Sequence, residues 1–250
     1  MHDPIVIQHI VEAINPQQHD HLIEIGPGKG ALTLPLLNRV EKLNVIEIDR
    51  DLAVALKTNI GDEHRLTIYE TDALNLDFNS FDHRDLRIVG NLPYNISTPI
   101  LFHLLAFREN IKDMTFMLQK ELVDRICANS GNKQYGRLSI MLQYYFDVES
   151  LLIVKPEAFT PSPKVDSAIV KLTPLPHPRY ELSDHESLKV IVRESFSQRR
   201  KTIRNALRKY LDESTIRSAG IAPENRAENL EISDFVKLAN CYHHMQINTL

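Results

Sequence analysis

The sequence predicts an α/β protein with a parallel sheet covered by helices on both faces, followed by a small all-helical domain. Short apolar strands alternate with helical segments through the first two-thirds of the chain. Pro174, Pro176 and Pro178 then interrupt the pattern, and only helical spacing follows them. We therefore expect two domains, residues 1–178 and residues 179–250, which the length of 250 residues can accommodate.

The first domain is built from strand and helix segments in turn. Apolar runs that end in glycine, asparagine or aspartate mark the strands, and apolar residues three and four apart mark the helices. Expected strands cover residues 21–25, 43–48, 66–69, 86–89 and 114–118, and expected helices cover 31–40, 51–59, 98–106 and 120–128. The later apolar segments 140–154 and 165–172 are expected as antiparallel strands.

The second domain reads as helices joined by turns. Ser183 and Glu186 form a capping-box pattern at the start of a first helix. A second helix is expected over residues 199–211, Gly220 and Pro223 mark a turn, and a last helix starts near residue 233.

Composition restricts the class of protein. An apolar fraction of 43% and a charged fraction of 25% exclude disordered, collagen-like and coiled-coil chains. The net charge of −4 gives a nucleic-acid partner no support by itself. We find no membrane span, no secretory signal and no HExxH, and Cys127 and Cys241 form no CxxC. We therefore expect a cytoplasmic monomer with reduced thiols and with neither a membrane nor a metal partner.

A glycine turn follows the first expected strand and opens a helix. Its glycines, Gly26, Gly28 and Gly30, let the backbone turn sharply and approach a nucleotide, although a plain strand-to-helix turn is the alternative. Glu47 ends the next strand, where a carboxylate can bind ribose hydroxyls, and Asp72 with Ala73 follows the third strand at the same edge. The spacing GxGxG differs from the dehydrogenase GxGxxG. It favours S-adenosylmethionine, which has no pyrophosphate, over a nicotinamide dinucleotide.

The tetrapeptide Asn91-Leu92-Pro93-Tyr94 follows the fourth strand, at the edge where such sheets bind ligands. The exocyclic amine of adenine has two N–H donors and a delocalised lone pair. The Asn91 side-chain oxygen and the Leu92 carbonyl could accept both hydrogens, Pro93 stiffens the turn, and Tyr94 offers a face for an unstacked base. A loop with a partly buried tyrosine is the alternative.

With these motifs the sequence resembles the KsgA family of small-subunit ribosomal RNA adenine N6,N6-dimethyltransferases. The resemblance implies a Rossmann-like, seven-stranded methyltransferase sheet, S-adenosylmethionine as donor, and dimethylation of two adjacent adenosines in the 3′-terminal hairpin of the rRNA. The matching segments span most of the chain: residues 24–30, 45–49, 91–99, 117–121, 135–139, 159–168, 198–205 and 220–229.

The resemblance also assigns site residues. Gly26, Glu47, Asp72 and Asn91 match the cofactor positions of the family, and Asn91, Leu92 and Tyr94 match its target-base motif. Phe159 matches an aromatic residue expected on the other face of the base, with a core phenylalanine as the alternative. Family members usually begin with a basic stretch that ends Gly-Gln-Asn-Phe-Leu and is expected to cover the cofactor and touch RNA. The present sequence starts just after that position, so we do not expect full activity of this chain.

A basic segment covers residues 193–209, where seven basic residues against one acidic residue give +6. Arg200, Arg204 and Arg208 recur every four residues, so one helix would align them in a row that suits a phosphate backbone. The alternative is a solvated face with intramolecular partners. The candidate RNA contacts are Arg199, Arg200, Lys201, Arg204 and Arg208, with Lys133 and Arg137 in a second loop over residues 129–137.

We predict an S-adenosylmethionine-dependent rRNA adenine N6-methyltransferase that acts on the small ribosomal subunit. One alternative is the erythromycin-resistance type, which methylates large-subunit rRNA on a similar fold and tends to be strongly basic. The other is a ribosome-assembly or transcription factor without chemistry, which the intact 91–94 tetrapeptide argues against. The sequence does not reveal the order of methylation or the assembly state of the substrate.

Overall fold

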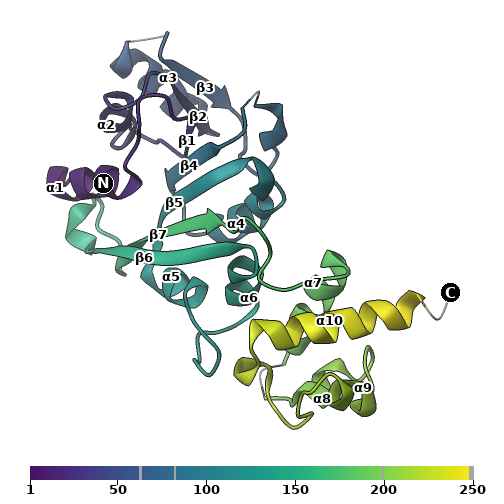
Figure 1. Ribbon diagram of the computed structural model, residues 1–250. Coiled ribbons are helices and arrows are strands. Elements are labelled where there is room, and N and C mark those ends of the chain that lie inside the picture. The colour runs from purple at the N-terminus through teal and green to yellow at the C-terminus, as the bar shows by residue number, and fades with distance from the viewer. Residues whose placement is uncertain (62–63, 82, 199, 248–250) are drawn as a thin grey trace. The chain divides into compact units, whose positions relative to one another are not determined.

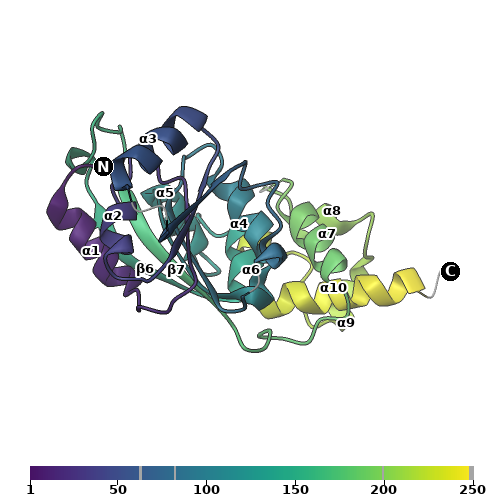
Figure 2. The same cartoon turned by 90° about the horizontal axis from the view of Figure 1, so that it is seen from above.

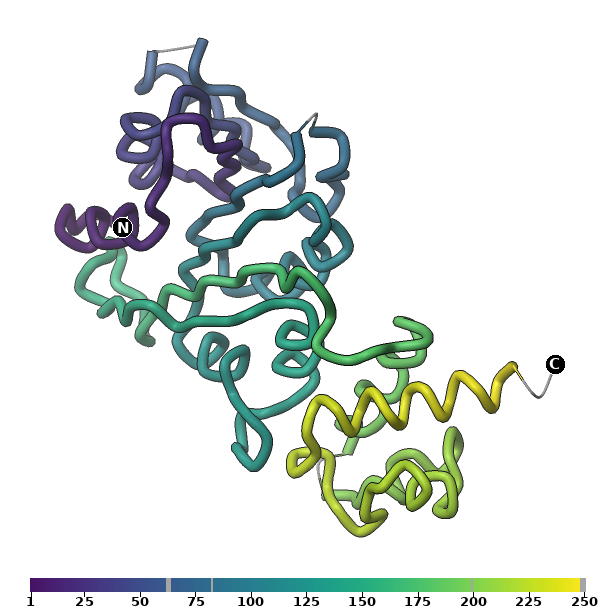
Figure 3. The backbone as a smooth tube through the Cα atoms, in the orientation of Figure 1, coloured from purple at the N-terminus to yellow at the C-terminus, as the bar shows by residue number. Residues whose placement is uncertain are grey.

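The computed structural model describes residues 1–61, 64–81, 83–198 and 200–247. The chain forms two compact units, which we describe separately. The first contains Met1–Val123 and Asp147–Pro174, and the second contains Asp124–Phe146 and Leu175–Leu250. Figure 3 lets the reader follow the chain through both units. The last change of unit, after Pro174, lies close to the predicted boundary at residue 178. Residues 124–146, which the sequence analysis assigned to the first domain, group with the second unit.

The first unit is built on a seven-stranded sheet with the order β3-β2-β1-β4-β5-β7-β6. β1 to β5 pair in parallel, and β7 runs antiparallel to β5. This order confirms the predicted α/β class and the Rossmann-like methyltransferase sheet. The strands are β1 (Leu22–Ile25), β2 (Leu43–Glu47), β3 (Leu66–Glu70), β4 (Leu86–Asn91), β5 (Ile111–Gln119), β6 (Phe146–Val154) and β7 (Ser167–Pro174).

Helices cover both faces of this sheet, with α1, α2 and α3 on one face and α4 on the other (Figures 1 and 2). Local capping explains where α1 and α3 start. Asp3 accepts hydrogen bonds from the first amides of α1, and Asp49 does the same for α3. The helical segments are α1 (Pro4–Ile14), α2 (Thr33–Leu37), α3 (Arg50–Ile60), α4 (Ser97–Leu105) and α5 (Lys120–Ile126), with short 3₁₀ turns at η1 (Phe78–Ser80), η2 (Arg108–Asn110) and η3 (Pro156–Ala158).

The described part of the second unit is helical. Its core is formed by the apolar faces of α7, α8 and α10, with Leu188, Ile203, Leu207 and Phe235 fully buried. The segments are α6 (Arg137–Gln143), α7 (His185–Ser195), α8 (Ile203–Leu207), α9 (Glu213–Ser218), η4 (Ala227–Asn229) and α10 (Ile232–Ile247). The turn at Gly220 and the last helix agree with the sequence prediction.

The prediction of a strand over residues 140–154 is wrong in its first part. Residues 140–143 belong to α6, and β6 begins only at Phe146. Leu138 to Gln143 are all buried, so their apolar run has no amphipathic period, and such a run does not distinguish a strand from a buried helix.

The prediction of a helix over residues 199–211 is also wrong in extent, because among the described residues 200–211 only Ile203–Leu207 is helical. The Ile203 amide donates to the Asn225 carbonyl at 2.7 Å, and Thr202 pairs with Arg226 in an isolated bridge. These contacts hold the preceding backbone extended, so the helix starts only at residue 203. The predicted cap of α7 is one residue off, since Asp184 rather than Ser183 accepts from the Ser187 amide, at 2.7 Å.

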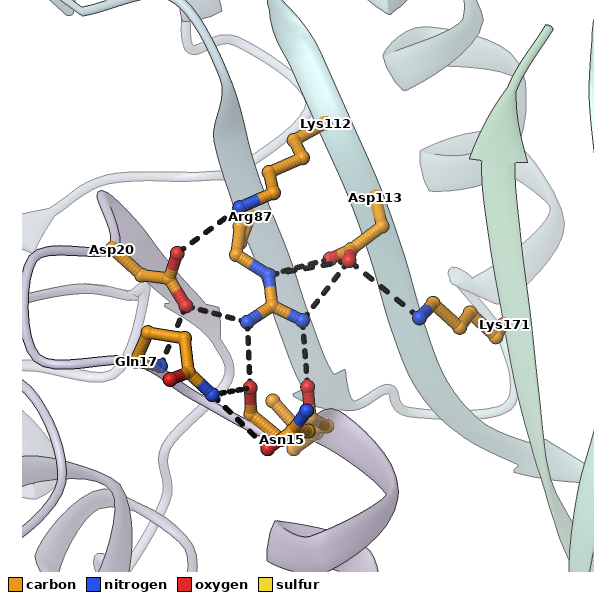
Figure 4. A network of polar contacts seen from close by, with 8 residues as sticks. Asn15, Gln17, Asp20, Arg87, Lys112, Asp113 and Lys171 are labelled. Atoms are coloured by element: carbon orange, nitrogen blue, oxygen red, sulfur yellow. Dashed lines mark hydrogen bonds and ion pairs between the residues drawn. The ribbon is translucent and has the colours of Figure 1, made fainter.

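A buried ion network joins α1 to the sheet (Figure 4). Arg87 on β4 donates to both oxygens of Asp113 on β5, to Asp20 at 2.5 Å, and to the Ile14 carbonyl at 2.6 Å. Although burial opposes it, the hydrogen bonds from Gln17 and Arg87 hold the pKa of Asp20 below its ordinary value. Arg87 thus bonds to two open carbonyls at the end of α1 and pairs with two acids at once.

Within the described ranges, no helix is both long and apolar enough to cross a membrane. The same ranges hold no group of three or more histidine, cysteine, aspartate or glutamate side chains placed to bind a metal ion. Cys127 and Cys241 are free thiols.

Candidate active site

The glycine turn leaves β1 at the carboxyl edge of the sheet. Gly26 and Gly28 have φ angles of +69° and +56°, a conformation that L side chains rarely adopt. The Gly26 amide donates to the Ile46 carbonyl at 2.9 Å, which fixes the turn against β2. The turn therefore presents bare backbone at the edge where a nucleotide can approach.

Glu47 lies at the same edge, as the sequence predicts. It is the last residue of β2, and one of its carboxylate oxygens accepts from the Gly28 amide at 3.1 Å. The other oxygen accepts from the Asp49 amide at 3.0 Å. A carboxylate has about four acceptor positions, so Glu47 is held in place and can still accept from ribose hydroxyls.

Glu24, beneath the turn, is a functional candidate that the sequence analysis did not single out. Its side chain is 1% exposed, and within the described part of the chain its Oε2 atom has no hydrogen-bond partner. Burial raises the pKa of Glu24 to about 7, and repulsion from the Glu47 carboxylate adds to the shift. An acidic residue in a buried strand was the only sequence signal for it.

Asp72 and Ala73 follow β3 next to Glu47. β2 and β3 pair in parallel with Glu47 opposite Glu70, so Asp72 lies two residues past that pair. One Asp72 oxygen accepts from the Leu74 amide at 2.9 Å, and the half-buried carboxylate keeps a second oxygen for a ligand. Ala73, the next residue, is buried and has only a small side chain.

Asn91 ends β4 beside the glycine turn. A Cβ atom added at Gly26 would lie 3.8 Å from the Asn91 carbonyl oxygen and 4.0 Å from Cδ of Pro93. None of the residues that the structure describes hydrogen-bonds to the Asn91 side-chain amide, which is half-buried. Gly90 makes this approach possible, because a Cβ there would lie 2.4 Å from the Ile25 carbonyl oxygen. The structure thus brings the predicted cofactor and target-base residues together.

The rest of the tetrapeptide is fixed by backbone and side-chain bonds. Leu92 is buried, and its amide donates to the Met117 carbonyl on β5 at 3.3 Å. The Pro93 carbonyl accepts from the Ile96 amide at 3.1 Å and so closes the turn. Tyr94 is 40% exposed, and its hydroxyl lies 3.2 Å from the hydroxyl of Ser167. Ser167 is a second residue that the sequence analysis missed, since only the pairing of distant strands brings it to the site.

Phe159 follows η3 in the loop between β6 and β7. It is half-buried and packs against the apolar cluster that contains Ile10, Met117 and Ile169. This packing is what the alternative of a core phenylalanine predicts. Among the described rings, none contacts Phe159. Its role on the second face of a base stays a prediction.

The predicted RNA contacts lie in the second unit, and Arg199 lies outside the described residues. Because the helix is short, Arg200 precedes α8, Arg204 lies within it and Arg208 follows it, so the predicted continuous helical row is absent from the described chain. Arg204 donates to Glu213 at 3.1 Å, as the alternative of an intramolecular partner expects. Arg200 and Arg208 are exposed, Lys201 is half-buried, and none of the three has an ion-pair partner among the described residues.

Lys133 and Arg137 belong to a loop that is held within the second unit. Both are exposed, and Arg137 opens α6. The Gly131 amide donates to the Glu228 carbonyl at 2.7 Å, which ties the loop to η4. The loop therefore has a defined place next to the start of α10.

The chain is similar to known proteins over almost its whole length. A relative from Photobacterium profundum, named ribosomal RNA small subunit methyltransferase A, is 51% identical over 245 residues, which is 96% of this chain and 89% of that protein. A relative of the same name from Marinomonas sp. is 50% identical over 245 residues, or 96% of this chain and 91% of that protein.

Two crystal structures share the fold. A dimethyladenosine transferase from Plasmodium falciparum is 28% identical, with a TM-score of 0.79 over 100% of this chain and 97% of that one. The 23S rRNA methyltransferase ErmE has a TM-score of 0.75 at 24% identity, over 97% of this chain and 99% of that one, and shows the fold alone. The family model described as ribosomal RNA adenine dimethylase matches residues 1–244. The resemblance predicted from the motifs is confirmed: the chain belongs to the ribosomal RNA adenine dimethylase family.

Proposed function

We propose that this methyltransferase transfers methyl groups from S-adenosylmethionine to N6 of two adjacent adenosines in the 3′-terminal hairpin of small-subunit rRNA, giving N6,N6-dimethyladenosine. The observation that carries the proposal is the half-buried Asn91 amide beside the bare glycine turn. The names of relatives at about half identity support the small subunit as the substrate. A cytoplasmic location follows from that substrate.

The residues at the sheet edge fit S-adenosylmethionine. The turn at Gly26 and Gly28 has no side chain in the way of the methionine part of the donor. Glu47 is oriented by two backbone amides and keeps acceptor positions for the ribose, and Asp72 keeps one oxygen for the adenine amine. Ala73 lies next to Asp72 and leaves room for the adenine ring. When bound, the donor supplies an electrophilic methyl group and a neutral thioether as leaving group.

The tetrapeptide prepares the nucleophile. The target amine donates one N–H to the Asn91 side-chain oxygen and the other to the Leu92 carbonyl, which turns its lone pair toward the methyl group. Pro93 has no N–H that could compete for these acceptors. The new C–N bond forms as the C–S bond breaks, the sulfur keeps the electron pair, and the ammonium product loses a proton to water. After the first transfer the amine has one N–H left, so one of the two acceptors suffices to hold it for the second.

The base must leave its stack to reach Asn91. The exposed ring of Tyr94 offers it a new stacking surface, and Phe159 is the candidate for the other face. Arg200, Lys201, Arg204 and Arg208, with Lys133 and Arg137, are the candidate phosphate contacts. Arg200 and Arg208, for which the described part of the chain offers no ion-pair partner, are the stronger candidates, because Arg204 already has Glu213 as a partner.

Methyl transfer from radiolabelled S-adenosylmethionine to unmethylated ribosomal subunits tests this function. We expect label on the small subunit and dimethyladenosine in its nucleoside digest. Asn91→Ala should lower kcat about a hundredfold or more, since it removes a group that positions the reacting amine. Asn95→Ala, at an exposed asparagine in the same turn, is the matched control and should keep the wild-type rate. Label on the large subunit alone would favour the erythromycin-resistance type, and full activity of Asn91→Ala would refute the mechanism.

A further inference from the structure

The hydroxyl of Tyr94 has an unusual partner for a side chain at the surface. The residue is 40% exposed, so its hydroxyl could be hydrated, yet it lies 3.2 Å from Oγ of Ser167, which is 1% exposed. The hydrogen bond therefore draws the far end of the ring toward the protein interior, while part of the ring stays accessible.

Ser167 is itself held in place by strand pairing. It is the first residue of β7, and antiparallel pairing places it opposite Gln119 at the end of β5. The Lys120 amide donates to the Asp166 carbonyl at 2.9 Å, which fixes the residue just before Ser167 as well. The backbone that carries the Ser167 hydroxyl is thus fixed by strand pairing at Ser167 and by a hydrogen bond at the preceding residue.

The tetrapeptide depends on the same strand. The Leu92 amide donates to the Met117 carbonyl, and Met117 is two residues before Gln119 on β5. The backbone end and the hydroxyl end of Tyr94 are therefore both positioned by the end of β5. The hydroxyl lies on the axis about which χ2 turns, so anchoring both ends restricts χ1 and thereby fixes the place of the ring.

We infer that Ser167 is a positioning residue for methyl transfer, which holds the Tyr94 ring at the place where the target adenine stacks on it. The inference rests on the proposed stacking role of Tyr94. Without this hydrogen bond the ring swings away by rotation about χ1, and the base spends less time with its amine at Asn91. The number of productive encounters then falls, whereas the phosphate contacts that set the affinity for the subunit are unchanged.

A double-mutant cycle tests the inference, using the ribosomal subunit that the wild-type chain methylates. Ser167→Ala and Tyr94→Phe each remove the same hydrogen bond. We expect each to lower kcat about two- to tenfold, the usual effect of one neutral hydrogen bond, with KM unchanged. The double variant should be no slower than either single variant. Ser167→Thr, which keeps the hydroxyl, should restore the rate.

Two further variants make the result specific. Ser195→Ala makes the same change at a serine that is also 1% exposed. Among the described residues its hydroxyl bonds only to the Ile191 carbonyl of its own helix, so this variant should leave kcat unaltered. Tyr94→Ala removes the stacking surface and should lower kcat about tenfold or more. Urea unfolding of every variant separates a fall in kcat from a loss of folded protein.

The outcomes distinguish two failures. If Tyr94→Ala lowers kcat but Ser167→Ala does not, or if the effects of Ser167→Ala and Tyr94→Phe multiply, Ser167 does not position Tyr94 and the inference is wrong while the proposed function stands. If Tyr94→Ala leaves kcat unchanged, the stacking role in the proposed function fails and this inference fails with it.

Discussion

Glu24 shows how a single residue can couple stability to pH. Its folded pKa of about 7 lies above the ordinary value of 4.5, because the charged form is buried. Between these values the folded chain keeps a proton that the unfolded chain has lost. The resulting stabilisation is complete below pH 4.5 and is lost as the pH rises toward 7, by about 3 kcal/mol at most.

We therefore expect Glu24→Gln to unfold at a higher urea concentration than the wild type at pH 8, and at nearly the same concentration at pH 4.5. The amide stays neutral, so it avoids the burial of a charge at high pH. Unfolding curves at four pH values between 4.5 and 8 measure the effect. Glu70→Gln, at an exposed glutamate that ends β3, is the control and should give no such gain. A loss of stability for Glu24→Gln at pH 8 would contradict the assignment, because it would mean that the ionised carboxylate is stabilising.

The Arg87 network joins the end of α1 to strands β4 and β5, so its contribution to stability is a property of how these elements pack together. Arg87→Met keeps the apolar stem but leaves Asp113 and Asp20 buried without their main partner, and it frees the carbonyls at the end of α1. Removal of one member of a buried ion pair costs about 3 to 5 kcal/mol. We expect a loss of unfolding free energy in this range, measured by urea unfolding at pH 7.

Lys112 provides a matched control, because it also bonds to Asp20, at 3.3 Å, but from a side chain that is half exposed (Figure 4). An exposed pair contributes about 1 kcal/mol or less, so Lys112→Met should cost much less than Arg87→Met. If both variants lost the same unfolding free energy, burial would not determine how much each ion pair stabilises the fold.

Sequence patterns predicted the elements whose period is visible along the chain. Strands β1 to β5 and helices α3 and α4 were placed within three residues of their observed bounds, because turn residues mark their ends. The helix α2 (Thr33–Leu37) is shorter than the predicted range 31–40. The helix α6 was missed since its residues are buried on all sides and show no period. The helix α8 was predicted too long, because its start is set by hydrogen bonds to residues 223–226, which no local pattern reveals.

The same reasoning applies to the site. Gly26, Glu47, Asp72 and Asn91 each end or follow a parallel strand, so their common edge could be predicted before the structure was known. Ser167 and the buried state of Glu24 depend on how distant strands pair and on how deep the turn lies. Both are properties of tertiary packing, and a single sequence contains no direct signal for them.

Charge distribution is a property of the whole molecule. The chain has a net charge of −4, but residues 193–209 contribute +6, which leaves −10 for the rest. The sequence analysis expected a continuous helical row of arginines, whereas in the structure Arg200 precedes α8, Arg208 follows it, and both are exposed. An acidic chain with one basic segment should bind RNA at that segment and repel it elsewhere.

With this distribution, the effect of removing a charge on RNA affinity should depend more on the position of that charge than on the net charge. Arg208→Gln and Arg204→Gln change the net charge equally, but Arg208 has no partner among the described residues, whereas Arg204 already neutralises Glu213. We expect Arg208→Gln to weaken binding to ribosomal RNA and to reduce the slope of log affinity against log salt by about 0.7 to 0.9, the effect of one lost phosphate contact. Arg204→Gln should change the slope less, and Glu213 retains Arg217 at 2.8 Å, so the fold tolerates the change. Binding titrations from low to high salt decide the question, because equal slopes for the two variants would show that only the net charge of the molecule attracts the RNA.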